Sequence, residues 1–183
     1  MTQPDEAGVA TPMVSRIDAP IESVELSSEM GPIIVATRDG AVCGLAWTDG
    51  FAAIGRRIRA QHPDSPWRAV SRVSTAEPVR AYLDGDLDAL EIVEVDVAGT
   101  PFQTRVWSEL RRIPVGTTIS YGELAGRVER PTASRAVGAA NGANPVSLVN
   151  PCHRVIAANG TLGGYGGGLD RKAWLLRHEG ALL

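Results

Sequence analysis

The sequence has few of the residues that stabilise small secreted proteins. It contains 2 cysteines and 3 histidines among 183 residues, too few for a disulfide framework and without the Cys/His pairs of a zinc knuckle. No window approaches the roughly 18 uninterrupted apolar residues of a membrane span, and the N-terminus lacks the basic start and apolar stretch of a signal peptide. We therefore expect a cytoplasmic protein in which Cys43 and Cys152 can do only thiol chemistry.

Charge is unevenly distributed along a composition that is otherwise globular, with 44% apolar residues, 20 Gly and 12 Pro. Residues 1–98 carry 8 basic and 16 acidic side chains, a net charge of −8, whereas residues 99–183 carry 10 basic and 5 acidic ones, a net charge of +5. The second half is therefore the candidate for a polyanionic partner, although so modest an excess is also typical of a solvated surface.

The first half predicts an α/β unit that follows a flexible tail over residues 1–15. Apolar and β-branched runs predict three strands, over residues 24–27, 33–37 and 41–47. Helical spacing predicts two helices, over residues 51–61 and 77–83. Alternation of polar and apolar residues predicts a further strand, over residues 91–97. A boundary at Ala98-Gly99 divides the chain into an N-terminal domain, residues 16–98, and a C-terminal domain, residues 99–183.

The second half has helical periodicity. Two capping boxes, Thr100-Pro101-Phe102-Gln103 and Ser120-Tyr121-Gly122-Glu123, predict helix starts. Pro131-Thr132 predicts the start of another helix, which ends at Gly142. Two short helices joined by a tight turn are a candidate helix-turn-helix, but helix pairs of this kind more often pack without DNA.

Cys152 is the candidate nucleophile. It follows Pro151 after an apolar run over residues 146–149 that predicts a buried strand, and His153 and Arg154 come directly after it. A turn at this point lets backbone N–H groups face the sulfur, and nearby positive charge favours the thiolate of a residue that is otherwise only about 3% ionised at pH 7. Free cysteines are more often small buried hydrophobes, which is how we interpret Cys43 in its apolar run.

A carboxylate and a glycine-rich loop follow in the sequence. The closing helix, predicted over residues 170–179, ends at Gly180, so Glu179 lies where the helix dipole disfavours negative charge. A histidine of a Cys–His pair would be its partner, with Arg177 or solvent as the alternatives. Residues 160–168 include six glycines, which either let the backbone approach a flat ligand closely or form a flexible connector.

These segments together resemble the O6-alkylguanine-DNA alkyltransferases, the methylated-DNA:protein-cysteine methyltransferases. The run Asn-Pro-Val-Ser-Leu-Val-Asn-Pro-Cys-His-Arg-Val at residues 144–155 resembles the active-site motif of that family. Four other motifs occur in the family's order, namely Ser120-Tyr121-Gly122, Ser134-Arg135-Ala136-Val137-Gly138, the Gly-Tyr-Gly-Gly-Gly loop and residues 171–180. The resemblance is dense over residues 99–181 and loose over residues 20–98.

The resemblance implies an α/β fold in two parts: an RNase-H-like N-terminal domain with an antiparallel sheet and helices, and a C-terminal helical domain with a helix-turn-helix. It implies that a monomer binds double-stranded DNA in the minor groove, flips out O6-alkylguanine or O4-alkylthymine, and transfers the alkyl group to its own cysteine. The product is a thioether, so each molecule acts once, without cofactor or metal. A non-catalytic damage-sensing helix-turn-helix protein and a cysteine hydrolase are the alternatives.

The resemblance also assigns roles to residues. Cys152 is the expected acceptor thiolate, His153 its base through a water molecule, Glu179 the carboxylate that orients the imidazole, and Asn144 the support of the turn. The residues expected to contact DNA or the flipped base are Tyr121, Arg135, Val155, Tyr165, Gly166 and Gly167. Asn150 departs from the family pattern, which usually has an apolar residue there, so it must find a hydrogen-bond partner or tilt the turn.

Overall fold

The first half of the chain folds around a four-stranded sheet. The computed structural model describes residues 19–182, so the tail predicted over residues 1–15 lies outside the described residues. The strands are β1 (Ile21–Leu26), β2 (Ile33–Arg38), β3 (Ala41–Trp47) and β4 (Trp67–Ala69). They lie in the order β3-β2-β1-β4, with β4 parallel to β1 and the other pairs antiparallel.

Helices α1 (Thr48–Gln61) and α2 (Ala76–Leu83) pack on opposite faces of this sheet. Successive side chains of a strand point to opposite faces, so Val35 of β2 packs in the core that contains α2, whereas Ala36 packs in the core that contains α1. Cys43 lies in the α1 core, and its thiol donates a hydrogen bond to the Ala36 carbonyl (3.4 Å). Its burial confirms Cys43 as a core residue, and the same burial raises the pKa of its thiol to about 12.

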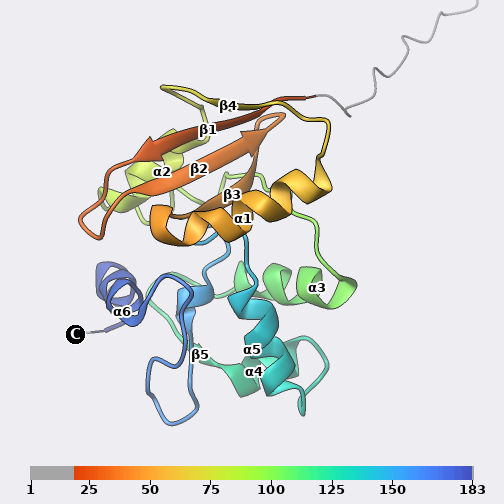
Figure 1. The fold of residues 1–183 in the computed structure, drawn as a ribbon. Coiled ribbons are helices and arrows are strands. Elements are labelled where there is room, and N and C mark those ends of the chain that lie inside the picture. The colour runs from red at the N-terminus through yellow and green to blue at the C-terminus, as the bar shows by residue number, and fades with distance from the viewer. Residues whose placement is uncertain (1–18, 183) are drawn as a thin grey trace, which may run out of the picture.

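The second half is mainly helical and lies below the sheet in Figure 1, with the last helix set to one side. Its elements are α3 (Pro101–Leu110), β5 (Ile119–Ser120), α4 (Tyr121–Arg127), α5 (Ser134–Gly142), the 3-10 turn η2 (Cys152–Arg154), β6 (Val155–Ile156) and α6 (Leu169–His178). Helices α3, α4 and α5 share a core that includes Val106, Leu124 and Val137. No helix within residues 19–182 is long and apolar enough to cross a membrane.

Two predicted strands are wrong. Residues 91–97 form only an isolated bridge, between Val95 and Val42, because the preceding chain closes into successive turns. Residues 146–149 likewise form only one bridge, between Val146 and Leu45. There the Asn150 N–H donates to the Val146 carbonyl (3.0 Å), so the run is turned rather than extended.

Several boundaries and one missed strand also differ from the prediction. Strand β1 covers residues 21–26 rather than 24–27, and α1 begins at Thr48 rather than at residue 51. Helix α5 begins at Ser134 rather than at Pro131-Thr132, because the Ala133 N–H donates to the Arg130 carbonyl (2.8 Å) in a separate turn. Strand β4 was not predicted, because a run of three residues is too short to show periodicity.

The helix caps allow a matched test of local stability. Both predicted capping boxes are present, and in α3 the Thr100 hydroxyl accepts the Gln103 N–H (3.2 Å). Thr75 occupies the same position before α2, but its hydroxyl makes no cap bond and has no partner among residues 19–182. We expect Thr100→Ala to lower the free energy of unfolding in urea by about 1 kcal/mol and Thr75→Ala to leave it unchanged or raise it. Equal losses would contradict the assignment of the cap.

Candidate active site

The backbone that leads to Cys152 is fixed by a pair of buried asparagines. The Asn144 amide donates to the Asn150 carbonyl (2.8 Å), and Asn144 Oδ1 accepts from the Val146 N–H (3.2 Å) and from Asn150 Nδ2 (3.2 Å). Asn150 thus finds a hydrogen-bond partner for its Nδ2, while its buried Oδ1 has none among residues 19–182. The turn between residues 144 and 152 is set by side-chain bonds within the motif itself.

Cys152 is the first residue of η2 and is only 6% exposed. Burial raises the pKa of its thiol, against the opposing effects of hydrogen bonding by Asn144, the positive charge of Lys172 and hydrogen bonding by Ser147. The loss of solvation therefore outweighs the groups that favour the thiolate. In the structure Cys152 is a buried thiol, and Asn144, Ser147 and Lys172 lie where they would stabilise its thiolate.

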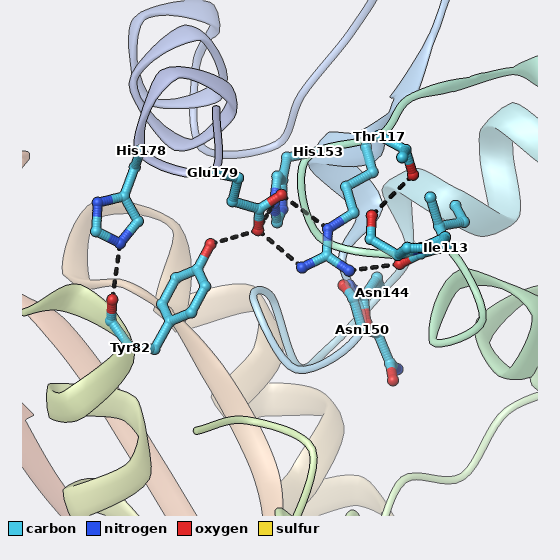
Figure 2. A network of polar contacts seen from close by, with 10 residues as sticks. Tyr82, Ile113, Thr117, Asn144, Asn150, His153, His178 and Glu179 are labelled. Carbon is cyan, nitrogen blue, oxygen red and sulfur yellow. Dashed lines mark hydrogen bonds and ion pairs between the residues drawn. The ribbon is translucent and has the colours of Figure 1, made fainter. Parts of the chain in front are cut away.

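Glu179 is placed by the end of α6. Gly180 has a positive φ of 73°, and the Gly180 and Ala181 N–H groups donate back to the Arg177 and Leu176 carbonyls (2.9 and 2.7 Å). This is a Schellman ending, which glycine adopts without a Cβ clash. It leaves Glu179 as the C-cap residue directly after His178, with its side chain directed into the protein (Figure 2).

The carboxylate of Glu179 accepts four hydrogen bonds. Tyr82 Oη (2.6 Å), His153 Nε2 (2.9 Å) and Arg154 Nη2 (2.8 Å) contact Oε1, and Arg154 Nε (2.8 Å) contacts Oε2 (Figure 2). Burial opposes ionisation of Glu179, but the bonds from His153 and Arg154 keep the pKa of its carboxyl well below the ordinary value. The partner is therefore histidine rather than Arg177 or solvent.

The hydrogen bonds define the protonation of His153. Because the Glu179 carboxylate is ionised, it can only accept, so the proton of a neutral imidazole lies on Nε2 and the lone pair on Nδ1. Nδ1 is buried and has no hydrogen-bond partner among residues 19–182, so it makes no direct bond to the Cys152 sulfur. Burial lowers the pKa of His153 despite the bond to Glu179. The imidazole is a neutral base at pH 7.

Three side chains in this region make contacts that were not predicted. Arg154, expected beside the sulfur, pairs with Glu179 and donates to the Ile113 carbonyl instead. No sequence pattern marks Tyr82 as a partner of Glu179, because an aromatic residue on the apolar face of a helix is typical of any core. Lys172 could have been found, since it is the one lysine in the sequence and lies on the face of α6 that buries Leu175 and Leu176.

Lys172 and Arg171 bind the glycine-rich loop. Lys172 Nζ donates to the Val155 carbonyl (2.6 Å), the Gly164 carbonyl (3.2 Å) and the Leu162 carbonyl, and burial lowers its pKa to about 8. Arg171 donates to the Gly167 carbonyl (3.1 Å). Because consecutive residues of α6 bind both parts of the loop, it is a positioned wall rather than a flexible connector.

This loop, Cys152 and helix α1 enclose a cavity of about 510 Å³. The predicted site residues that line it are Tyr121, Asn144, Cys152, Tyr165, Gly166 and Gly167. Four of the six surround the sulfur with aromatic or glycine surface, which suits a flat ring. The structure does not bring Arg135 or Val155 into this lining, since Arg135 is exposed on α5 and Val155 is buried beneath the loop.

Comparison with known proteins assigns the chain to a family. Residues 101–181 match the family model described as the DNA binding domain of 6-O-methylguanine DNA methyltransferase. The chain is 55% identical over 163 residues to the methylated-DNA–protein-cysteine methyltransferase of Salmonella typhimurium, an alignment that covers 87% of this chain and 95% of that protein. The chain belongs to the methylated-DNA–protein-cysteine methyltransferase family. Its activity is DNA repair by transfer of an alkyl group to a cysteine.

Other members of this methyltransferase family agree in sequence and fold. The Mycolicibacterium paratuberculosis methyltransferase is 44% identical over 159 residues, covering 87% of this chain and 92% of that protein. The crystal structure of Mycobacterium tuberculosis O6-methylguanine methyltransferase matches with a TM-score of 0.72 and 36% identity, covering 88% of this chain and 93% of that one. The crystal structure of Mycobacterium tuberculosis OGT in complex with DNA matches with a TM-score of 0.74 and 39% identity, covering 87% of this chain and 93% of that chain.

The buried ion pair predicts a pH-dependent stability. Glu179→Gln leaves Arg154 buried without a counter-charge, which should lower the free energy of unfolding at pH 7 by about 3–5 kcal/mol. The folded pKa of Glu179 is depressed, so its contribution is present above the ordinary glutamate pKa of about 4.3 and is lost as the pH falls toward the folded value. We therefore expect the difference between the two proteins to shrink below about pH 4.3 in urea unfolding measured across pH.

The matched control is Glu77→Gln, which removes an ion pair with Arg72 in which both side chains are exposed. Its effect should stay within about 1 kcal/mol at every pH. A pH-independent loss in Glu179→Gln would show that the cost comes from packing rather than from charge.

Proposed function

We propose that this methyltransferase repairs O6-alkylguanine, and O4-alkylthymine, in double-stranded DNA by one irreversible transfer of the alkyl group to Cys152. The observation that carries the proposal is a thiol at the wall of a cavity, next in sequence to a neutral imidazole that donates Nε2–H to an ionised carboxylate. The relatives' name states methylated DNA as donor and a cysteine as acceptor, and a solved relative is in complex with DNA.

The reaction breaks one bond and forms one bond at the alkyl carbon. The sulfur of Cys152 attacks that carbon, the carbon–O6 bond breaks with its electron pair going to guanine, and a thioether forms. The thiol proton passes through a water molecule to Nδ1 of His153, and the imidazolium returns it through water to guanine as the base leaves. A thioether has no carbonyl for water to attack, so the protein is consumed. The donor is the damaged base itself, so the step requires no cofactor.

The cavity and α5 have separate tasks in this proposal. Tyr121 meets the flipped base, Tyr165 and the backbone of Gly166 and Gly167 flank it, and the region of Val155 binds the guanine edge. The exposed position of Arg135 on α5 suits a side chain that fills the vacated place in the base stack, with small neighbours on the helix permitting close approach in the minor groove. A weakly paired alkylguanine costs less to extrude, which favours damaged bases.

The architecture completes the proposal. Residues 16–98 form an RNase-H-like N-terminal domain, and residues 99–183 form the DNA-binding domain in which α4 and α5 are the helix-turn-helix. The net charge of +5 in the second half supports contact with phosphates. The protein is a monomer in solution.

Alkyl transfer should occur at one cysteine only. With a labelled O6-methylguanine duplex, we expect one label per chain, located on Cys152 by peptide mass spectrometry. Cys152→Ala should abolish transfer and retain DNA binding, whereas Cys43→Ala should retain both, since Cys43 is buried in a different core. More than one equivalent transferred per chain would instead support a hydrolase, and binding without any transfer would support a damage sensor.

Base extrusion should depend on Arg135. Because flipping a base costs a few kcal/mol, Arg135→Ala should slow single-turnover transfer from a paired duplex by about tenfold or more. The defect should shrink when the alkylguanine stands opposite a mismatch or in a single strand. Arg80→Ala, an exposed arginine of α2, is the control and should transfer at the wild-type rate. A defect equal on paired and unpaired substrates would contradict the extrusion role.

A further inference from the structure

One contact to the catalytic carboxylate comes from the first half of the chain. Tyr82 is the penultimate residue of α2 and is fully buried, with its ring in an edge-on contact with His178 (centroids 5.3 Å apart). Its backbone carbonyl accepts from His178 Nε2 (2.7 Å), and its hydroxyl donates to Glu179 Oε1 (2.6 Å). Figure 2 shows both bonds side by side, so consecutive residues at the end of α6 bind the same tyrosine.

The hydroxyl of Tyr82 shares its acceptor with the imidazole. A carboxylate offers about four acceptor positions, and those of Glu179 are occupied by Tyr82, His153 and the two donors of Arg154. Tyr82 and His153 both bind Oε1, so each bond withdraws electron density from the oxygen that the other uses. The Tyr82 bond is the shorter of the two. Removal of its hydroxyl would leave Oε1 a stronger acceptor for Nε2–H.

We propose that Tyr82 is a positioning residue for alkyl transfer, which acts through Glu179 to orient the His153 imidazole and to limit its basicity. The inference rests on the proposed role of His153 as the base for Cys152. It assigns to α2, some 70 residues before the Pro-Cys-His-Arg motif, a direct part in the catalytic network. A helix that otherwise packs only in the core then sets how readily the imidazole accepts a proton at Nδ1.

The charged groups around the imidazole define the expected direction. Glu179 favours its protonated form, whereas Arg154 and Lys172 oppose it. Tyr82→Phe retains the ring and its packing and removes only the donor to Glu179. The carboxylate then bonds more strongly to Nε2–H, which stabilises the imidazolium and raises the pKa of His153. The neutral fraction of the base therefore falls at any given acidic pH.

The experiment measures single-turnover transfer from an O6-methylguanine duplex across pH for the full chain. We expect Tyr82→Phe to move the acidic limb to higher pH by about 0.5 unit, which is about a threefold slower rate on that limb. The rate on the alkaline plateau should stay near that of the wild type. A purely structural role would lower the rate by the same factor at every pH.

Proton NMR of the free protein gives a second measurement that needs no substrate. The sequence has 3 histidines, so the imidazole resonances of His153 can be distinguished from those of His62 and His178. In Tyr82→Phe the Nε2–H resonance of His153 should move downfield, because its bond to Glu179 strengthens. Since this measurement does not involve DNA, it tests the Tyr82 inference even if alkyl transfer to Cys152 is not observed.

The matched control is Val79→Ala, which removes buried surface from the same face of α2 without touching the carboxylate. It should lower the melting temperature and leave both the pH profile and the His153 resonance unchanged. If Tyr82→Phe behaves like Val79→Ala, with lower stability but an unmoved pH limb and resonance, the inference is overturned. If the limb and the resonance move as stated, it is supported.

Discussion

The buried ion pair between Glu179 and Arg154 is the interaction on which the rest of the site depends. Charges inside a protein are costly unless they are paired and their remaining hydrogen-bonding positions are filled. Glu179 satisfies this requirement only by drawing donors from α2 and from η2 to the end of α6. The position of the imidazole is therefore a consequence of neutralising one carboxylate, and Tyr82 ties that carboxylate to the first half of the chain, whose apolar core also includes Leu175 of α6.

At rest the site keeps one uncompensated charge, that of Lys172, which acts on both Cys152 and His153. Glu179 and Arg154 cancel, His153 is neutral, and burial keeps Cys152 as a thiol. A thiol is a weaker nucleophile than a thiolate and reacts slowly with oxidants. In the mechanism proposed above, the buried thiol is the single acceptor, and its proton is removed by a base already in place when a substrate carbon reaches the sulfur.

The cavity depends on both halves of the chain. Helix α1 supplies part of its lining, and Arg57 of that helix donates to the Ala143 carbonyl (2.7 Å) just before the asparagine turn. On the opposite wall, Arg171 contacts both carboxylate oxygens of Asp49 (2.9 and 2.7 Å) as well as the glycine-rich loop. The sheet domain therefore contributes to the shape of the pocket and is more than an attachment to the motif-bearing half.

The sequence by itself determined the features that depend on residues close to one another in the chain. Strands β2 and β3, the two capping boxes, the core role of Cys43 and the end of α6 at Gly180 followed from residues close to one another in the chain. The cluster of Cys152, His153, Glu179 and Asn144 also followed, because its residues lie in dense motifs. Tertiary structure decided the rest: Tyr82 as a partner of Glu179, Arg154 as the counter-charge and the protonated state of the thiol. Each of these depends on burial and on contacts between segments far apart in sequence, which periodicity and spacing do not encode.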